Sequence, residues 1–158
     1  MLGAFAVGKT SLVQQYVHSI FSDKYHTTVG VKIEKKQVRA NDTDVDLIIW
    51  DLHGEDAFQH VRLSYLKGSS GCIYVADGTR EQTLLTALNL KEIAENTLGK
   101  IPCIVVINKS DLRDQWEIDP SILGDLKKQE ILVFHTSAKT GEEVQQVFQL
   151  LTRKIMEK

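Results

Sequence analysis

The 158-residue sequence is poor in several features that mark particular protein classes: it has two cysteines, two prolines and no long apolar run. A bilayer-spanning helix needs about 20 apolar residues, and a secretory leader needs a basic stretch before an apolar one, so neither is predicted. Cys72 and Cys103 lie in apolar, strand-like runs. They are typical of reduced core residues in a cytoplasmic protein, with one disulfide between them as the alternative.

The sequence also lacks a strong charge of either sign. Its 19 Lys+Arg and 21 Asp+Glu residues give a net charge of −2, without the basic excess expected of a nucleic-acid-binding protein. We therefore expect no nucleic-acid partner. A composition of 42% hydrophobic and 25% charged residues is ordinary for a globular protein. The length fits one domain over residues 1–158, which buries about 70% of its unfolded surface without metal or disulfide staples.

Short apolar runs alternate with longer periodic segments, which predicts an α/β domain built on a mostly parallel sheet. Strands are predicted at residues 29–38, 45–50, 71–76, 103–107 and 131–135, and helices at 9–19, 80–98 and 142–157. The turn-forming residues 41–44 predict that the first two strands form an antiparallel hairpin at the sheet edge.

The segment from Gly3 to Thr10 reads Gly-Ala-Phe-Ala-Val-Gly-Lys-Thr and fits the pattern G-x-x-x-x-G-K-[ST]. Glycines let the backbone wrap a phosphate closely and point its N–H groups at it. Lys9 can reach the β- and γ-phosphates as a compact cation, and the Thr10 hydroxyl can ligate Mg²⁺. The alternative is a glycine-rich turn with a chance Lys-Thr, a match with odds of about one in a hundred at average residue usage.

The apolar run 104–107 leads into Asn108-Lys109-Ser110-Asp111. The carboxyl end of such a strand lies on the ligand side of an open α/β sheet. The Asp111 carboxylate can accept two hydrogen bonds from guanine, whereas adenine lacks that pair of donors and would leave the carboxylate unpaired. Asn108 can tie loops together, and the stem of Lys109 can lie along the base. A plain polar turn is the alternative, and the preceding phosphate loop weakens it.

Five motifs in order carry a resemblance to a known family. They are the phosphate loop, the loop threonine Thr28, the W-D-x-x-G segment ending at Gly54, N-K-x-D, and Ser-Ala-Lys at 137–139. The set resembles the small GTPases of the Ras superfamily, and Thr-Val-Gly-Val at 28–31 together with Trp-Asp at 50–51 resembles the Rab-like branch. The resemblance runs from Gly3 to the last helix. It implies a three-layer α/β P-loop GTPase domain, with a mostly parallel sheet, one antiparallel edge strand and helices on both faces.

The resemblance also implies a function: a switch that binds GTP or GDP with Mg²⁺ and hydrolyses GTP to GDP and phosphate. The residues implied in nucleotide binding are Ala6, Val7, Gly8, Lys9, Thr10, Ser11, Phe21, Tyr25, Thr28, Gly54, Asn108, Lys109, Asp111, Ser137, Ala138 and Lys139. The implied Mg²⁺ group consists of Thr10, Thr28 and, through a water, Asp51. The implied catalytic group consists of Glu55, Lys9, Thr28 and Gly54.

Some of these implied roles are specific. Phe21 would pack edge-on against the guanine, with plain core packing as the alternative, and Tyr25 would lie over the phosphates. The Ala138 N–H would bond guanine O6. Thr28 and Gly54 would hold the γ-phosphate, so that GTP orders the two flanking loops and hydrolysis releases them. Effector proteins would read residues 29–34 and 57–66, and an exchange factor and a GTPase-activating protein would complete the cycle.

Three residues depart from the family pattern. Glu55 stands where a glutamine usually orients the attacking water; a carboxylate cannot donate a hydrogen bond to the γ-phosphate, and its charge repels it. Phe5 replaces a small residue and can obstruct an arginine inserted by an activating protein, or can rotate out and pack under the second switch loop. His53 replaces alanine and is either a titratable group near the γ-phosphate or a solvated loop residue. These departures predict slow hydrolysis, with a non-hydrolysing GTP/GDP-binding interaction module as the alternative.

The ends of the sequence carry two further expectations. The last residues contain no terminal cysteine and few lysines, so we expect no intrinsic membrane anchor in this sequence, either because the protein is a soluble family member, such as a bacterial one, or because a tail has been removed. A phosphate loop should follow a buried strand, and Met1-Leu2 is too short to form one. We therefore expect a first strand that is cut short, with residues upstream of Met1 in the natural protein or a misassigned start.

Overall fold

A computed structural model describes residues 1–24, 27–54 and 63–157. Four parallel strands form one sheet in the order β1-β4-β5-β6. These strands are β1 (Leu2–Gly3), β4 (Cys72–Asp77), β5 (Cys103–Asn108) and β6 (Val133–Thr136). Nearly every side chain of β4 and β5 is buried, because helices cover both faces of these central strands.

A hairpin of two longer strands, β2 (Val31–Ala40) and β3 (Thr43–Leu52), forms a separate antiparallel two-stranded sheet. Asn41 and Asp42 form its two-residue turn with φ values of 48° and 60°. Asparagine and aspartate tolerate this left-handed conformation, which matches the twist of a hairpin. The Met1 amino group donates a hydrogen bond to the Trp50 carbonyl (2.8 Å), which links the hairpin to the end of the parallel sheet.

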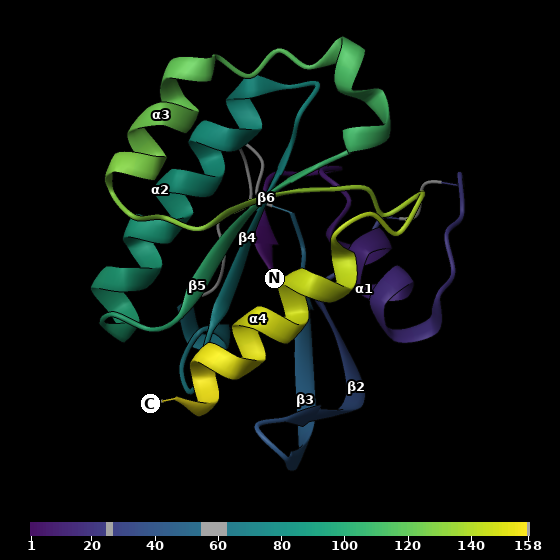
Figure 1. The fold of residues 1–158 in the computed structure, drawn as a ribbon, viewed down its shortest axis with the longest axis vertical. Coiled ribbons are helices and arrows are strands. Elements are labelled where there is room, and N and C mark those ends of the chain that lie inside the picture. Colours follow the sequence, from purple (N-terminus) through teal and green to yellow (C-terminus); the bar gives the residue numbers. More distant parts are fainter. Residues whose placement is uncertain (25–26, 55–62, 158) are drawn as a thin grey trace.

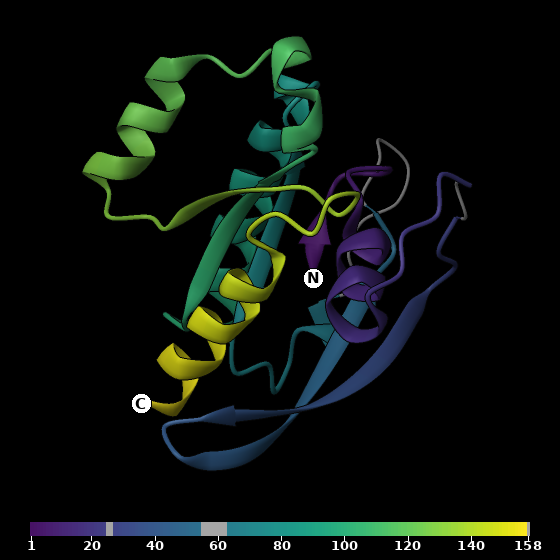
Figure 2. The same ribbon diagram turned by 45° about the vertical axis from the view of Figure 1, so that its right-hand side comes forward.

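The helices lie on the two faces of the parallel sheet (Figures 1 and 2). On one face lie α1 (Lys9–His18) and α4 (Val144–Met156), and on the other lies α2 (Glu81–Leu98), with Leu126 of α3 (Pro120–Lys128) in the same core. Two short 3₁₀ helices, η1 (Leu63–Tyr65) and η2 (Ser110–Gln115), lie in the connections. The predicted three-layer α/β class is confirmed.

The strands supply both cores because their side chains alternate between the two faces. The core with α1 and α4 contains Ile73, Val75, Ile104 and Val106, and the core with α2 contains Tyr74, Ala76, Val105 and Ile107. Each predicted strand and helix is present within a few residues of its predicted bounds. Helix α3 was not predicted, although its start is marked in the sequence. The Asp119 side chain accepts a hydrogen bond from Ser121 N (2.8 Å) as the N-cap, and Pro120 is the first helical residue.

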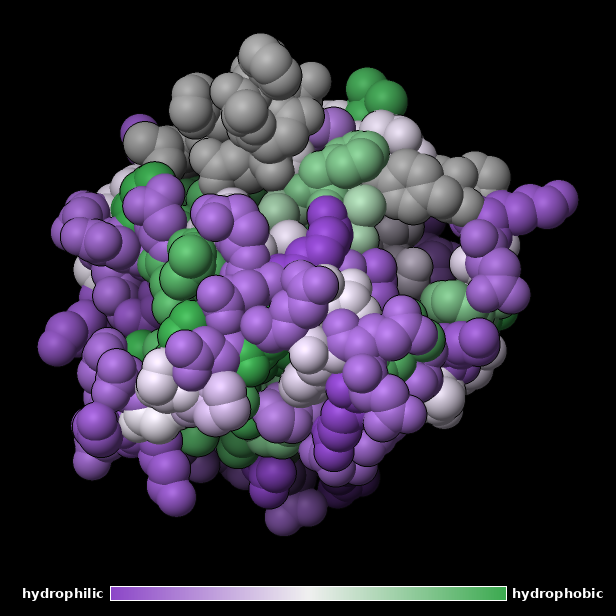
Figure 3. Space-filling view, turned by 90° about the horizontal axis from the view of Figure 1, so that it is seen from above, coloured by the Kyte–Doolittle hydropathy of each residue, from purple (hydrophilic) through white to green (hydrophobic). Residues whose placement is uncertain are grey.

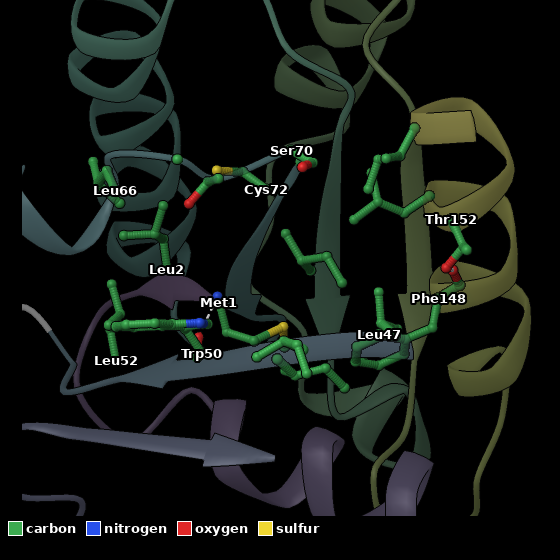
Figure 4. Close-up of a pocket in the computed structure, with 18 of the residues that line it drawn as sticks. Met1, Leu2, Leu47, Trp50, Leu52, Leu66, Ser70, Cys72, Phe148 and Thr152 are labelled. Carbon is green, nitrogen blue, oxygen red and sulfur yellow. Dashed lines mark hydrogen bonds between the residues drawn. The ribbon is translucent and has the colours of Figure 1, made fainter. Parts of the chain in front are cut away.

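A groove of about 370 Å³ lies between β3, β4 and α4, where β1 supplies only two residues to the sheet. Leu47 and Phe148 line one part of it and Leu2 lines another, beside the hydrogen bond from Met1 to Trp50 (Figure 4). Side-chain packing by Ile49 and Leu52, one in each core, also holds the hairpin against the body of the protein. Among the described residues, no helix has the length and apolarity needed to cross a membrane.

Two adjacent leucines of α2 provide a test of this packing. Leu84 is fully buried, and Leu85 is 43% exposed. We expect Leu84→Ala to lower the free energy of unfolding by about 3 kcal/mol, because it leaves a cavity between α2 and the sheet. Leu85→Ala, the matched control, should cost less than about 1 kcal/mol. Urea unfolding followed by circular dichroism measures both; equal losses would contradict the placement of this helix face.

Candidate nucleotide-binding site

A cleft of about 880 Å³ opens at the end of the molecule where the carboxyl ends of the parallel strands lie. Figure 3 views the molecule from this end, whose surface is largely hydrophilic with scattered hydrophobic areas. The cleft brings together most residues that the sequence selected: Ala6, Gly8, Lys9, Thr10, Ser11, Phe21, Thr28, Gly54, Asn108, Lys109, Asp111, Ala138 and Lys139. Its volume suits a drug-sized or nucleotide-sized ligand.

The phosphate loop joins β1 to α1 and turns sharply at two residues with positive φ, Ala6 (59°) and Gly8 (98°). Left-handed residues in a turn of this kind point successive backbone N–H groups into one concavity that can hold an anion. Gly8 is required for a second reason: a Cβ there would collide with the side-chain amide of Asn108. That amide donates to the Val7 carbonyl (3.0 Å) and so fixes the loop from behind.

Lys9 is 6% exposed, and its ammonium group donates to the carbonyls of Gly3 (3.1 Å) and Ala4 (2.9 Å). Burial lowers the pKa of Lys9 from 10.5 to about 8; Asp51 opposes this shift and Arg80 adds to it. The protein thus holds a partly desolvated cation beneath the loop. A phosphate in the concavity would favour the charged form of this lysine.

Three oxygen-bearing side chains meet beside the phosphate loop. The Thr10 hydroxyl lies 2.7 Å from the Thr28 hydroxyl and donates to one oxygen of Asp51 (2.5 Å). Asp51 is fully buried, and its other oxygen has no hydrogen-bond partner among the described residues. Burial raises the pKa of this carboxyl, an effect that the Thr10 bond and Lys9 oppose.

This group fits Mg²⁺ by its chemistry. Hydroxyl and carboxylate oxygens are the ligands that Mg²⁺ takes, and a buried carboxylate oxygen without a partner is costly unless something compensates it. Among the described residues, no cluster of three or more His, Cys, Asp or Glu side chains offers an alternative metal site.

A second set of hydrogen bonds holds the side of the cleft that residues 108–111 and 136–139 form, where the sequence predicts a base-reading loop. The Asn108 side-chain oxygen accepts from Ala138 N (3.2 Å) and the Thr136 hydroxyl (3.2 Å). The Ser137 hydroxyl donates to one oxygen of Asp111 (2.6 Å), which orients that carboxylate. Ser137 is buried behind the cleft, and Val7 lies in the core, so neither side chain lines the cleft.

His53 and Gly54, which follow β3, contact the phosphate loop and the segment of Thr28. A Cβ at Gly54 would lie 2.6 Å from Phe5 Cα and 2.9 Å from the Ala4 carbonyl oxygen, so this glycine allows β3 to end directly against the phosphate loop. The Nδ1 atom of His53 is hydrogen-bonded to the Thr28 carbonyl, and the His53 and Phe5 rings lie 6.4 Å apart. Phe5 is 36% exposed.

Two selected residues, Tyr25 and Glu55, lie outside the described residues, as do positions 57–62 of the expected partner surface. Phe21 lines the cleft and also packs against the α1–α4 core. The sequence reasoning missed Asp77 and Arg80, which lie just behind the cleft and contact Lys109 and the Phe5 carbonyl. In the sequence, Asp77 is marked only as an aspartate at the carboxyl end of a buried strand, and that position alone does not show which groups it contacts.

A phosphate-binding loop at a helix N-terminus, a nearby group of oxygen ligands and an aspartate-containing loop after β5 define a P-loop nucleotide-binding protein. The Ras family sequence profile matches residues 1–157. The chain therefore belongs to the Ras family of GTP-binding GTPases, as the motifs predicted.

Relatives of Rab type cover almost the whole chain. The Ras-related protein Rab-7b of Mus musculus is 35% identical over 163 residues, which covers 99% of this chain and 80% of the mouse protein. The Rab-7b proteins of Homo sapiens and Bos taurus are 34% and 33% identical to this chain, and their alignments also cover 99% of this chain and 80% of each relative. The predicted Rab-like character is confirmed.

The lowered pKa of Lys9 predicts a pH-dependent affinity for GDP. In the free protein Lys9 loses its proton as the pH rises through about 8, and bound phosphates raise its pKa, so binding takes up a proton above that pH. We expect affinity to fall up to about tenfold per pH unit between pH 8 and 9, and the contribution of Lys9 to be nearly constant between 6 and 7.

Isothermal titration calorimetry with GDP, in buffers of different ionisation enthalpy, measures both the affinity and the proton uptake. Lys9→Met should bind weakly and without the proton uptake, whereas Lys128→Met, at a position on α3 whose side chain is 80% exposed, should behave as the unsubstituted protein. Proton uptake that persists in Lys9→Met would assign it to another group.

Proposed function

We propose that the chain is a guanine-nucleotide switch that binds GTP or GDP together with Mg²⁺ and hydrolyses GTP slowly. The observation that carries the proposal is the convergence of Thr10, Thr28 and the unpartnered oxygen of Asp51 beside the phosphate loop. Thr10 and Thr28 line the same cleft as Asp111, and Asp51 is buried against Thr10.

Each part of the cleft would bind one part of the ligand. The N–H groups of the phosphate loop would cradle the β-phosphate, and Lys9 would exchange the carbonyls of Gly3 and Ala4 for phosphate oxygens. Bound Mg²⁺, held by Thr10, Thr28 and Asp51, would neutralise charge between the phosphates. Asp111, oriented by Ser137, would accept hydrogen bonds from guanine.

The switch property would reside in Thr28 and Gly54, whose segments flank the place of the γ-phosphate. His53 contacts the Thr28 carbonyl directly, so the two segments are already linked through protein atoms. A γ-phosphate that bonds both segments would stabilise this closed arrangement, and its loss would leave the links through protein atoms: the His53 contact and the backbone hydrogen bond from His53 N to the Gly30 carbonyl (2.9 Å).

Partner proteins would read the surface next to Thr28. Val29 is 89% exposed, Ile33 is 52% exposed and Trp50 is 40% exposed, and the Trp50 ring lies 6.3 Å from that of Tyr65. Exposed apolar and aromatic side chains of this kind favour protein contacts. We propose this face for effectors, with an exchange factor and a GTPase-activating protein as further partners. The two free thiols, Cys72 and Cys103, support a cytoplasmic location.

The rate of hydrolysis would depend on Glu55 and Phe5. A carboxylate at position 55 would repel the γ-phosphate and cannot donate to it. A non-hydrolysing binding module uses the same nucleotide contacts, so binding does not distinguish the two functions. Release of phosphate over hours, after loading with GTP and Mg²⁺, distinguishes them: none at all would favour the binding module. Displacement of bound GDP by ATP at equal affinity would overturn the guanine assignment.

The proposed slow hydrolysis predicts that substitution of Glu55 raises the hydrolysis rate. We expect Glu55→Gln, alone or with Phe5→Gly, to raise the single-turnover rate of GTP hydrolysis about tenfold or more, because the amide can both accept from water and donate to the γ-phosphate. The matched control is Glu92→Gln on an exposed position of α2, which should leave the rate unchanged. An unchanged rate in the double variant would show that neither residue limits hydrolysis.

A further inference from the structure

Asp77, the last residue of β4, is 1% exposed and receives hydrogen bonds on both carboxylate oxygens. One oxygen accepts from Thr79 N (3.0 Å) and the Thr79 hydroxyl (2.7 Å). The other oxygen accepts from Arg80 Nε (3.1 Å) and Lys109 Nζ (2.6 Å). A single buried carboxylate therefore holds one local turn and two cations that lie 29 positions apart in the sequence.

Arg80 extends this contact to the phosphate loop. Its Nη2 atom donates to the Phe5 carbonyl (3.0 Å), a backbone group in the middle of that loop. The guanidinium is planar and its donors have fixed directions, so the bond to Asp77 also fixes the direction of the donor that meets Phe5. A continuous path thus runs from the phosphate loop through Arg80 and Asp77 to Lys109 in the base-reading loop.

The backbone around Lys109 is fixed independently of its side chain. Lys109 has a φ of 69°, and its carbonyl accepts from Trp116 Nε1 (3.0 Å). Gly78 N donates to the Asn108 carbonyl (3.0 Å), and a Cβ at Gly78 would collide with the Trp116 indole. With the backbone held in this way, Asp77 is the partner that the structure gives to the Lys109 ammonium group.

The charge of Asp77 is maintained in this setting. Burial alone would raise its pKa, but the hydrogen bonds from Lys109 and Thr79 outweigh burial and hold the pKa below its ordinary value. The carboxylate is therefore ionised at neutral pH and forms an ion pair with each cation. Since neither Asp77 nor Arg80 lines the cleft, any effect on the ligand must act through the two loops.

We propose that Asp77 is a positioning residue that couples the phosphate loop to the base-reading loop, through Arg80 and Lys109, and so slows nucleotide release. This inference rests on the proposed nucleotide-binding function. Loss of the carboxylate leaves two cations without a buried counter-charge, and both loops lose a fixed contact. Asp77 contributes nothing to the chemistry of hydrolysis; it sets how firmly two walls of the cleft are held in register.

Asp77→Asn separates the coupling from the local turn. The asparagine oxygen can still accept from Thr79, whereas its NH₂ group cannot accept from Arg80 or Lys109. We expect this variant to release a fluorescent GDP analogue about tenfold faster or more, in the presence of Mg²⁺ and excess GDP. Arg80→Ala should give a smaller increase, and the double variant should match Asp77→Asn, because Arg80 acts through Asp77.

Two controls distinguish positioning from loss of stability. Thr79→Val removes a hydroxyl bond to Asp77 but keeps both cations paired, and should release GDP within about twofold of the original rate. Leu84→Ala lowers stability without touching this path, and should also leave release within about twofold. If Leu84→Ala accelerates release as much as Asp77→Asn, general destabilisation explains the effect and the proposal is wrong.

The remaining outcomes are also decisive. Failure of the unsubstituted protein to bind the analogue would overturn the proposed function itself. Normal binding with unchanged release from Asp77→Asn would overturn only the coupling. If circular dichroism shows that Asp77→Asn does not fold, Arg80→Ala becomes the test. Arg80 is half-exposed, and its loss leaves the buried Asp77 still paired with Lys109. If Arg80→Ala then releases the GDP analogue at the same rate as the unsubstituted protein, the coupling is rejected.

Discussion

The buried side chain of Asn108 is the contact on which the binding end of the molecule depends. Its NH₂ group donates to Val7 in the phosphate loop, and its oxygen accepts from Thr136 and Ala138 at the end of the next strand. Asn108 is 2% exposed, so an unmade bond here would leave a buried polar group unpaired. One amide thus fixes the mutual positions of three segments that are distant in the sequence.

The charges of the cleft follow from the same tight arrangement. Lys9 and Asp51 are both nearly or fully buried, and each opposes the pKa shift that burial imposes on the other. A phosphate group and a divalent cation are the partners that would relieve both desolvation penalties at once. Asp77 is the contrasting case: its hydrogen bonds already compensate it within the protein. The cleft therefore leaves charge unsatisfied where a ligand would bind and satisfies it where the loops are joined.

Local sequence was enough to predict the strands, three helices and the phosphate loop, because each depends on short-range patterns. Apolar runs marked β4 and β5, and Gly8 with Lys9 marked the loop. Helix α3 was not predicted, although Ile122, Leu123 and Leu126 form an apolar stripe at helical spacing that packs in the core with α2. The contacts of Asp77 were not predicted, because they join three segments that are distant in the sequence and no sequence motif describes them. The hairpin was predicted, but its separation from the parallel sheet depends on which strands pair.

The sequence by itself determined that this protein belongs to the Ras family, and it predicted a phosphate loop and a guanine-reading aspartate, since residue types at fixed spacing carry that information. Tertiary structure alone decided which of these groups meet. It placed the Thr10 hydroxyl against Asp51, turned His53 toward the Thr28 carbonyl and connected Arg80 to the phosphate loop. Such contacts depend on strand order and helix packing, and these are properties of the whole chain rather than of any local pattern.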